Sequence, residues 1–227
     1  PIGVSRMSPL ERYKADLQRP DFFHDPAQER AVRHLQRLYD ELIASDQTRP
    51  GLLDRLRKRK PEPVKGLYFW GGVGRGKTML MDFFFAACPA KRKRRVHFHD
   101  FMADAHDRIA AHRKALKEGK VKENDPIAPV ARDIASESRV ICFDEFAVND
   151  IADAMILSRL FSALFANGVV LVATSNVAPD DLYRDGLNRA LFEPFIGILK
   201  RNAGIIGLGD VQDYRQAKLA GMPVYLT

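Results

Sequence analysis

Four glycines stand within residues 71–76, and a lysine and a threonine follow them directly. The stretch GGVGRGKT (71–78) has the spacing G-x-x-x-x-G-K-T and lies between an apolar run, VKGLYFW (64–70), and an apolar segment typical of a helix. A loop that wraps a phosphate chain must turn its backbone N–H groups inward, and glycine permits this because it has no Cβ. A strand before the glycines and a helix after them is the context of a phosphate-binding loop rather than of a chance turn.

The motif assigns a task to each of its last residues. Lys77 is expected to reach the β- and γ-phosphates of a nucleotide, and Thr78 is expected to hold Mg²⁺. The N-terminus of the following helix adds a partial positive charge. The predicted nucleotide-contacting residues are Gly71, Gly72, Val73, Gly74, Arg75, Gly76, Lys77, Thr78 and Met79.

A pair of acids ends a second apolar run, VICFDEF (140–146). We expect Asp144 to hold Mg²⁺ and Glu145 to orient or polarise an attacking water; the alternative is a strand that simply ends in surface acids. No Asn-Lys pair, the guanine reader of GTPases, occurs anywhere in the sequence, so the nucleotide predicted is ATP or ADP. The second acid favours hydrolysis over transfer to another nucleotide.

A third polar strand end is ATSN (173–176), where Asn176 could bond the γ-phosphate or the attacking water. Asn is also common in turns, so an ordinary turn residue is the alternative reading. The carboxyl ends of parallel strands share one edge of a sheet, which is where ligands bind. We therefore expect Asn176 to lie beside the phosphate loop and the acid pair.

From residue 64 onward, short apolar runs alternate with helical stretches, which predicts an α/β fold with a parallel sheet covered on both faces. Strands are predicted at 64–70, 95–101, 138–145, 168–176 and 204–210. Helices are predicted at 25–42 and 151–166. Further helices are predicted to begin at Lys77, to follow the second strand as far as about Arg113, and to follow the fourth strand as far as about Asn202. A charged connection is predicted at 114–126. Three regions follow: a helical N-terminal segment (1–63), the nucleotide-binding core (64–210) and the start of a C-terminal region (211–227).

The net charge of +7 comes in part from two basic runs, RLRKRK (55–60) and KRKRR (91–95). Such runs are usually solvated loops or helix ends, and a surface that binds nucleic acid or an anionic membrane is the alternative. The absence of a signal-peptide core or a membrane-spanning apolar run leads us to expect a cytoplasmic protein. Cys88 and Cys142 are expected to be buried thiols.

Three histidines, His97, His99 and His106, raise the question of a metal site. His97 and His99 would share one face of the predicted strand 95–101. No carboxylate or Cys cluster at ligand spacing accompanies them, so ordinary packing or hydrogen bonding is the favoured reading.

Three stretches together resemble the ZapE family of AAA+ ATPases, which act in bacterial cell division and have mitochondrial relatives. These are FHDFMADAH (98–106), CFDEFAVNDIADAMIL (142–157) and ATSNVAPDDLYRDGLNRALFEPFI (173–196). The resemblance implies a P-loop AAA+ core with a central five-stranded sheet, Asp144 and Glu145 as the acidic pair, and Asn176 as the first sensor. It also implies a helical lid, which the sequence after the fifth strand is too short to supply.

The resemblance further implies ATP-driven action on a protein partner, either the division-ring protein FtsZ in bacteria or proteins under quality control in mitochondria. Assembly into a ring is implied, with an arginine from the neighbouring subunit acting on the γ-phosphate. Arg189 is the candidate for this catalytic finger, with Arg184 and Arg201 as rivals and an ordinary surface arginine as the alternative reading. The implied location is the cytoplasm, at the division site or the inner-membrane surface. A helicase-loader type of ATPase and a nucleotide-gated binding module with little turnover remain as alternatives.

Overall fold

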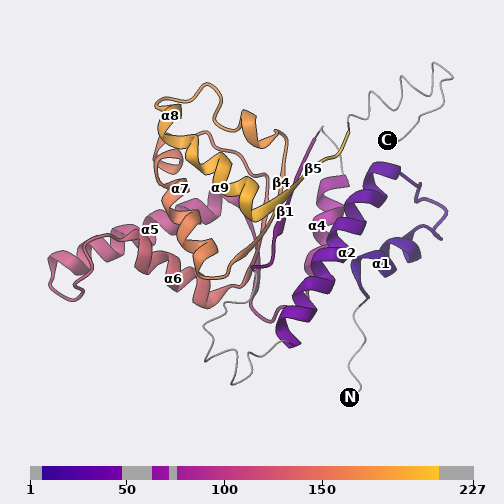
Figure 1. Ribbon diagram of the computed structural model, residues 1–227, viewed down its shortest axis with the longest axis horizontal. Helices are drawn as coiled ribbons and strands as arrows, with labels where there is room; N and C mark the ends of the chain where they lie inside the picture. The colour runs from indigo at the N-terminus through magenta and orange to yellow at the C-terminus, as the bar shows by residue number, and fades with distance from the viewer. Residues whose placement is uncertain (1–6, 48–62, 72–75, 210–227) are drawn as a thin grey trace.

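The computed structural model of the chain describes residues 7–47, 63–71 and 76–209 (Figure 1). These residues form a five-stranded sheet with helices on both sides, which confirms the α/β fold expected from the sequence. In chain order the elements are α1 (Pro9–Asp16), α2 (Pro26–Gln47), β1 (Gly66–Trp70), α4 (Gly76–Ala87), β2 (Lys93–His97), α5 (Phe98–Lys117), α6 (Ile127–Glu137), β3 (Val140–Asp144), α7 (Ile151–Ala166), β4 (Val170–Ser175), η1 (Pro179–Asp181), α8 (Arg189–Phe192), α9 (Pro194–Asn202) and β5 (Ala203–Gly207).

The strands are all parallel and follow the order β2-β3-β4-β1-β5. Strand β4 lies between β3 and β1, with Phe143 opposite Ala173 and Trp70 opposite Ser175. The carboxyl ends of β3, β4 and β1 therefore adjoin at one edge of the sheet. This edge carries the acid pair, Asn176 and the start of the Gly-rich loop.

Alternation along each strand divides the core into two clusters, one on each face of the sheet. The helices α1, α2 and α4 cover one face, and α5, α6, α7 and α9 cover the other (Figure 1). The first cluster includes Leu35, Leu67, Phe84, Cys142 and Val172, and the second includes Phe101, Ile141, Phe143, Phe161 and Leu171. Burial on both faces explains why β3 and β4 are almost wholly apolar.

The N-terminal helices follow the capping signals in the sequence. The backbone N–H of Ala27 donates to the Asp25 carboxylate at 3.0 Å, so Asp25 caps α2. Gln28, three residues after Asp25, donates to the sulfur of Met79 at 3.7 Å and links α2 to α4. The shorter helix α1, which we did not predict, begins with a reciprocal capping box between Ser8 and Glu11.

The second strand was misplaced by the sequence analysis, which put it at 95–101. Strand β2 ends at His97, and α5 begins at Phe98. The buried side chains of α5 recur at helical spacing and form one stripe against the sheet: Phe98, Phe101, Met102, Ala105 and Ile109. His97 and His99 therefore do not share a strand face, because His99 lies in the first turn of α5.

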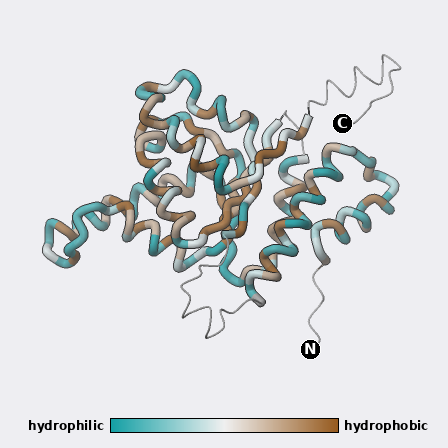
Figure 2. Tube along the Cα trace, in the orientation of Figure 1, coloured by the Kyte–Doolittle hydropathy of each residue, from teal (hydrophilic) through white to brown (hydrophobic). Residues whose placement is uncertain are grey.

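The connection predicted at 114–126 is shorter than expected, because α5 continues to Lys117. The hydropathy colouring shows this end of α5 as a mainly hydrophilic extension that projects from the body of the molecule (Figure 2). Helix α6 was not predicted, although Ile127, Val130, Ala131 and Ile134 mark its buried face. The predicted helices at 151–166 and before Asn202 are confirmed as α7 and α9.

The basic run at 91–95 is a solvated loop or helix end only in part, because Lys91 and Arg92 are exposed in a bend. Its last three residues form the start of β2. The Lys93 ammonium donates to the Phe85 carbonyl at 2.6 Å, and Arg92 donates to the Ser136 carbonyl at 2.7 Å. These contacts satisfy carbonyls at the ends of α4 and α6. The other basic run, 55–60, lies outside the described residues.

Both cysteines are free and buried, as expected. No helix in the described part of the chain is long and apolar enough to cross a membrane. The C-terminal region predicted at 211–227, which was expected to be too short for a lid, lies outside the described residues.

Candidate nucleotide site

The Gly-rich loop leaves the carboxyl end of β1 and enters α4 at Gly76. Gly71 has φ 139°, a conformation that side chains disfavour, and its N–H donates to the Ser175 carbonyl at 3.3 Å. This bond ties the start of the loop to the end of β4. Four of the predicted contact residues, Gly72, Val73, Gly74 and Arg75, lie outside the described residues.

Lys77, in the first turn of α4, points back over the strand ends. Its ammonium donates to the Gly71 carbonyl at 2.8 Å, to the Ser175 carbonyl at 3.3 Å and to the Asn176 side-chain oxygen. Partial burial lowers the Lys77 pKa, and the negative charge of Glu145 acts in the opposite direction. The structure thus brings Lys77 and Asn176 together, as the sheet-edge argument predicted.

The next two residues of α4 differ in their surroundings. Thr78 is exposed, so its hydroxyl is available to a ligand at the mouth of the loop. Met79 is half-buried and accepts the hydrogen bond from Gln28, which gives its side chain a packing role. Direct nucleotide contact by Met79 stays a prediction.

The two consecutive acids face different environments. Asp144 is 17% exposed and accepts two hydrogen bonds from Arg95, from Nε at 2.8 Å and from Nη2 at 3.1 Å. Glu145 is 78% exposed, and its carboxylate lies 3.7 Å from Nδ1 of His97. The backbone of Glu145 is left-handed, with φ 54°, and this turn sends the two side chains in different directions.

A cavity of about 310 Å³ lies beside Lys77, between the ends of β3 and β4 and the start of α7. Glu145, Ser175 and Asn176 line it, together with His99 and Asp150. Ser175 holds the wall in shape, because its hydroxyl donates to the Phe146 carbonyl at 2.7 Å and accepts from the Val177 N–H at 3.2 Å. An attacking water and a terminal phosphate would both find polar groups here.

The side chains present suit Mg²⁺ bound with a nucleotide. Thr78 offers a hydroxyl oxygen, and each oxygen of Asp144 keeps a lone pair beyond the bond from Arg95. Mg²⁺ prefers oxygen ligands and usually takes only one or two from protein, the others coming from water and phosphate. The described residues contain no cluster of three or more His, Cys, Asp or Glu side chains placed to hold a metal by themselves.

One of the three histidines has the hydrogen-bonding role that the sequence analysis favoured. His106 pairs with Asp153 at 2.7 Å and joins α5 to α7. His97 adjoins Glu145, and His99 lines the cavity.

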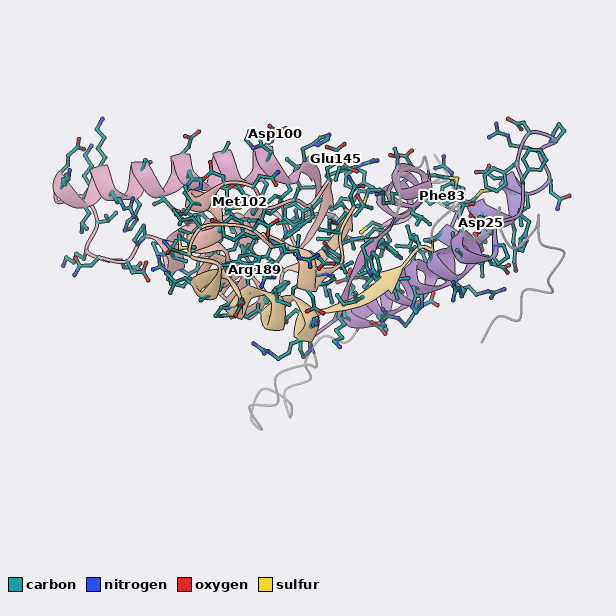
Figure 3. The ribbon with its side chains drawn as sticks, turned by 90° about the horizontal axis from the view of Figure 1, so that it is seen from above. Asp25, Phe83, Asp100, Met102, Glu145 and Arg189 are labelled. Atoms are coloured by element: carbon teal, nitrogen blue, oxygen red, sulfur yellow. The ribbon has the colours of Figure 1, made fainter. Side chains whose placement is uncertain are left out.

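Arg189 is held within its own chain. Its guanidinium donates to the carbonyls of Asp180 at 2.6 Å and Leu182 at 3.3 Å and to the Glu193 carboxylate at 3.0 Å. Figure 3 labels Arg189 and Glu145 and shows them well separated. Arg184 is freer, at 74% exposed, and Arg201 is exposed as well. The finger role of Arg189 stays a prediction, and it would require these hydrogen bonds to be released.

Two residues of the site were missed by the sequence analysis. Ser175 gives no signal of its own, because a serine before Asn176 reads as part of the turn. Arg95 was interpreted only as part of the basic run 91–95. Its position two residues before the end of β2 places it opposite β3.

Comparison with known proteins gives consistent family matches. A family model described as AFG1-like ATPase matches residues 7–227. The cell division protein ZapE of Escherichia coli (strain K12) is 41% identical over 234 residues, which cover 99% of this chain and 60% of that protein. Lactation elevated protein 1 homolog B of Danio rerio is 51% identical over 173 residues, covering 74% of this chain and 34% of that protein. This chain therefore spans less than two thirds of the length of these relatives.

Solved structures with similar folds are distant in sequence. Domain III of the replication initiation protein DnaA from Thermotoga maritima matches with a TM-score of 0.51 at 17% identity, covering 91% of this chain and 78% of that one. A structure of DnaI matches with a TM-score of 0.50 at 15% identity, covering 86% of this chain and 93% of that one. At these identities the likeness concerns the fold alone.

Proposed function

This chain belongs to the AFG1-like ATPase family, and from that premise we propose that it binds ATP with Mg²⁺ and hydrolyses it to ADP and phosphate. The observation that carries the proposal is the position of the Lys77 ammonium, which lies against Gly71 and Asn176 at the adjoining ends of β1 and β4. A terminal phosphate bound there would have a cation on one side and the polar cavity on the other.

Each side chain then has one task. Lys77 neutralises phosphate charge, and Thr78 and Asp144 hold Mg²⁺, which supplies further neutralisation of the phosphates when bound. Glu145, exposed at the cavity wall, orients the attacking water and accepts its proton. Asn176 donates from its amide nitrogen to the terminal phosphate or to that water.

Two variants test this division of tasks. Lys77→Ala should weaken ATP binding about ten- to a hundred-fold, because charge-assisted hydrogen bonds to phosphate are lost. Glu145→Gln should bind ATP normally and hydrolyse it slowly, because the side chain keeps its shape and loses its basicity. Calorimetry measures binding, and multiple-turnover phosphate release measures hydrolysis.

Lys200→Ala is the matched control, since that lysine pairs with Asp180 at the surface. Full affinity for ATP in Lys77→Ala would refute the site. Normal turnover in Glu145→Gln would remove Glu145 from its role. Negligible turnover by the wild-type protein, with tight binding, would favour a nucleotide-gated binding module.

We further propose that hydrolysis drives a change in a protein partner in cell division, with the FtsZ ring as the candidate and the bacterial cytoplasm as the setting. The name of the E. coli relative, a cell division protein, supports this. Internal bonding of the basic run 91–95 removes one reason to favour nucleic acid.

Sedimentation of purified FtsZ polymers with each variant tests the partner. Glu145→Gln with ATP should co-sediment, and Lys77→Ala should not. Equal sedimentation of the two variants would count against an ATP-dependent contact. Salt-sensitive retention of DNA in the same preparations would point to the helicase-loader alternative.

A further inference from the structure

Arg95 connects three elements beneath the candidate magnesium site. It lies on β2, donates to both oxygens of Asp144 on β3, and forms an ion pair with Asp82 on α4. The two bonds to Asp144 come from Nε and Nη2, so the flat guanidinium fork fixes the plane of the carboxylate. At 24% exposed, Arg95 is largely shielded from solvent.

The sheet register explains this placement. Arg95 is opposite Cys142, and Asp144 lies two residues further along β3, on the same face of the sheet. Cys142 belongs to the cluster under α4, so this is the face that α4 covers. Asp82 stands one helical turn after Thr78 on α4, and Arg95 thus bridges the helix that carries Thr78 to the strand that carries Asp144.

The side chains of Asp82, Arg95 and Asp144 together keep a negative charge that attracts a cation. One guanidinium faces two carboxylates, those of Asp82 and Asp144, so the three side chains together carry one negative charge. The fork leaves each oxygen of Asp144 with a free lone pair. The group can therefore hold Asp144 still without cancelling its attraction for a metal.

We propose that Arg95 is a positioning residue for Mg²⁺, which orients the Asp144 carboxylate and sets its distance from Thr78. The proposal rests on the proposed function, because it assumes that nucleotide and Mg²⁺ bind at this edge of the sheet. Without the fork, Asp144 can rotate, and part of its orientation must be restored each time the metal binds. Removal of an outer partner of a metal ligand typically lowers metal affinity on the order of ten-fold or more.

The test variant is Arg95→Met, which removes the fork and its charge. Its control is Arg94→Met, which makes the same change in size and charge at the neighbouring position of β2. Arg94 is opposite Ile141, whose side chain belongs to the other face of the sheet, and its partner is Asp104 at 3.4 Å. A third variant, Arg95→Lys, keeps the charge and loses the fork.

The experiment measures binding of a fluorescent, non-hydrolysable ATP analogue as a function of free Mg²⁺, and again in EDTA. Arg95→Met should need about ten-fold more Mg²⁺ for half-saturation, with unchanged affinity in EDTA. Arg94→Met should match the wild type, and Arg95→Lys should fall between the two. Thermal unfolding of each variant checks that the fold is kept.

Equal Mg²⁺ requirements in Arg95→Met and Arg94→Met would overturn the inference. A lower requirement in Arg95→Met would also overturn it, since Arg95 would then compete with the metal for Asp144. Equal loss of affinity with and without Mg²⁺ would show a general structural role and overturn it too. Absence of nucleotide binding, or of any Mg²⁺ effect, in the wild-type protein would instead refute the proposed function on which the inference rests.

Discussion

Replacement of Asn176 by alanine should change nucleotide binding and hydrolysis in opposite directions. The three donors of the Lys77 ammonium are directed at three acceptors of the chain, namely Gly71, Ser175 and Asn176. A phosphate that binds Lys77 must displace at least one of them. The Asn176 oxygen is the one on a rotatable and exposed side chain, so it is the acceptor that gives way.

The size of the effect follows from this contact. A hydrogen bond to a charged group contributes about 1.5–3 kcal/mol, and exposure to solvent reduces that to roughly 0.5–1 kcal/mol here. Because 1.4 kcal/mol is about ten-fold in affinity, Asn176→Ala should bind ADP roughly two- to five-fold more tightly. ATP should gain less, since the variant also loses the proposed contact with the terminal phosphate. Hydrolysis should fall by ten-fold or more, on the order of one lost transition-state donor.

Calorimetry with ADP and steady-state phosphate release measure the two quantities. Asn167→Ala is the control, because Asn167 caps the end of α7 by donating to the Ala163 carbonyl, before β4 begins at Val170. Unchanged or weaker ADP binding in Asn176→Ala would refute the idea that Asn176 competes with phosphate for Lys77. Unchanged hydrolysis would refute its role as a sensor.

Three further predictions concern the fold and its signals. Glu137→Gln should lower the free energy of unfolding by about 0.5–1 kcal/mol near pH 7. Arg108 donates to both Glu137 oxygens and lowers the Glu137 pKa. The stability that this ion pair contributes is therefore present above the ordinary pKa of 4.5 and is lost as the pH falls through the folded pKa. Denaturant titrations at neutral pH and near pH 3 check this, and an equal loss at both would contradict it. Gly66→Ala should disrupt the pairing of β1 with β4 and destabilise the fold, because the added Cβ would lie 1.8 Å from the Leu171 carbonyl oxygen. Circular dichroism and solubility measure the loss of structure. Wild-type stability in this variant would contradict the prediction, since the two strands would then have accommodated the Cβ without loss. Trp70 immediately precedes Gly71, so ADP should change the emission of this single tryptophan, and a flat titration at saturating ADP would show that the indole does not sense the site.

Local sequence patterns predicted most of the side chains that the structure brings together at the candidate site. The Gly-rich loop, the acid pair and Asn176 each follow a buried strand, and strand ends of a parallel sheet must meet at one edge. That rule places Lys77 and Asn176 at the same edge of the sheet. The pairing of β1 with β4, which the sequence analysis did not predict, brings them into contact.

The parts that were missed depend on register or on competing periods. The role of Arg95 requires β2 to pair with β3 at one specific offset and α4 to cover that face, and KRKRR shows no period that reveals it. The stretch after His97 combines strand-favouring aromatics with helical spacing of Phe98, Phe101 and Met102. Burial of that stripe against the sheet decided in favour of a helix, and tertiary packing of this kind overrides local preference.

The left-handed backbone of Glu145 places the proposed catalytic role of this residue in conflict with the stability of the folded chain. A side chain in this conformation costs roughly 1–2 kcal/mol. Glycine would recover only part of this free energy, because glycine loses more conformational freedom on folding. Glu145→Gly should then give a protein that is at least as resistant to heat and that has lost its proposed base. A laboratory selection for thermal tolerance alone would reward that change. Directed evolution of this protein should therefore screen for phosphate release in every round, since at this position durability and turnover are alternatives.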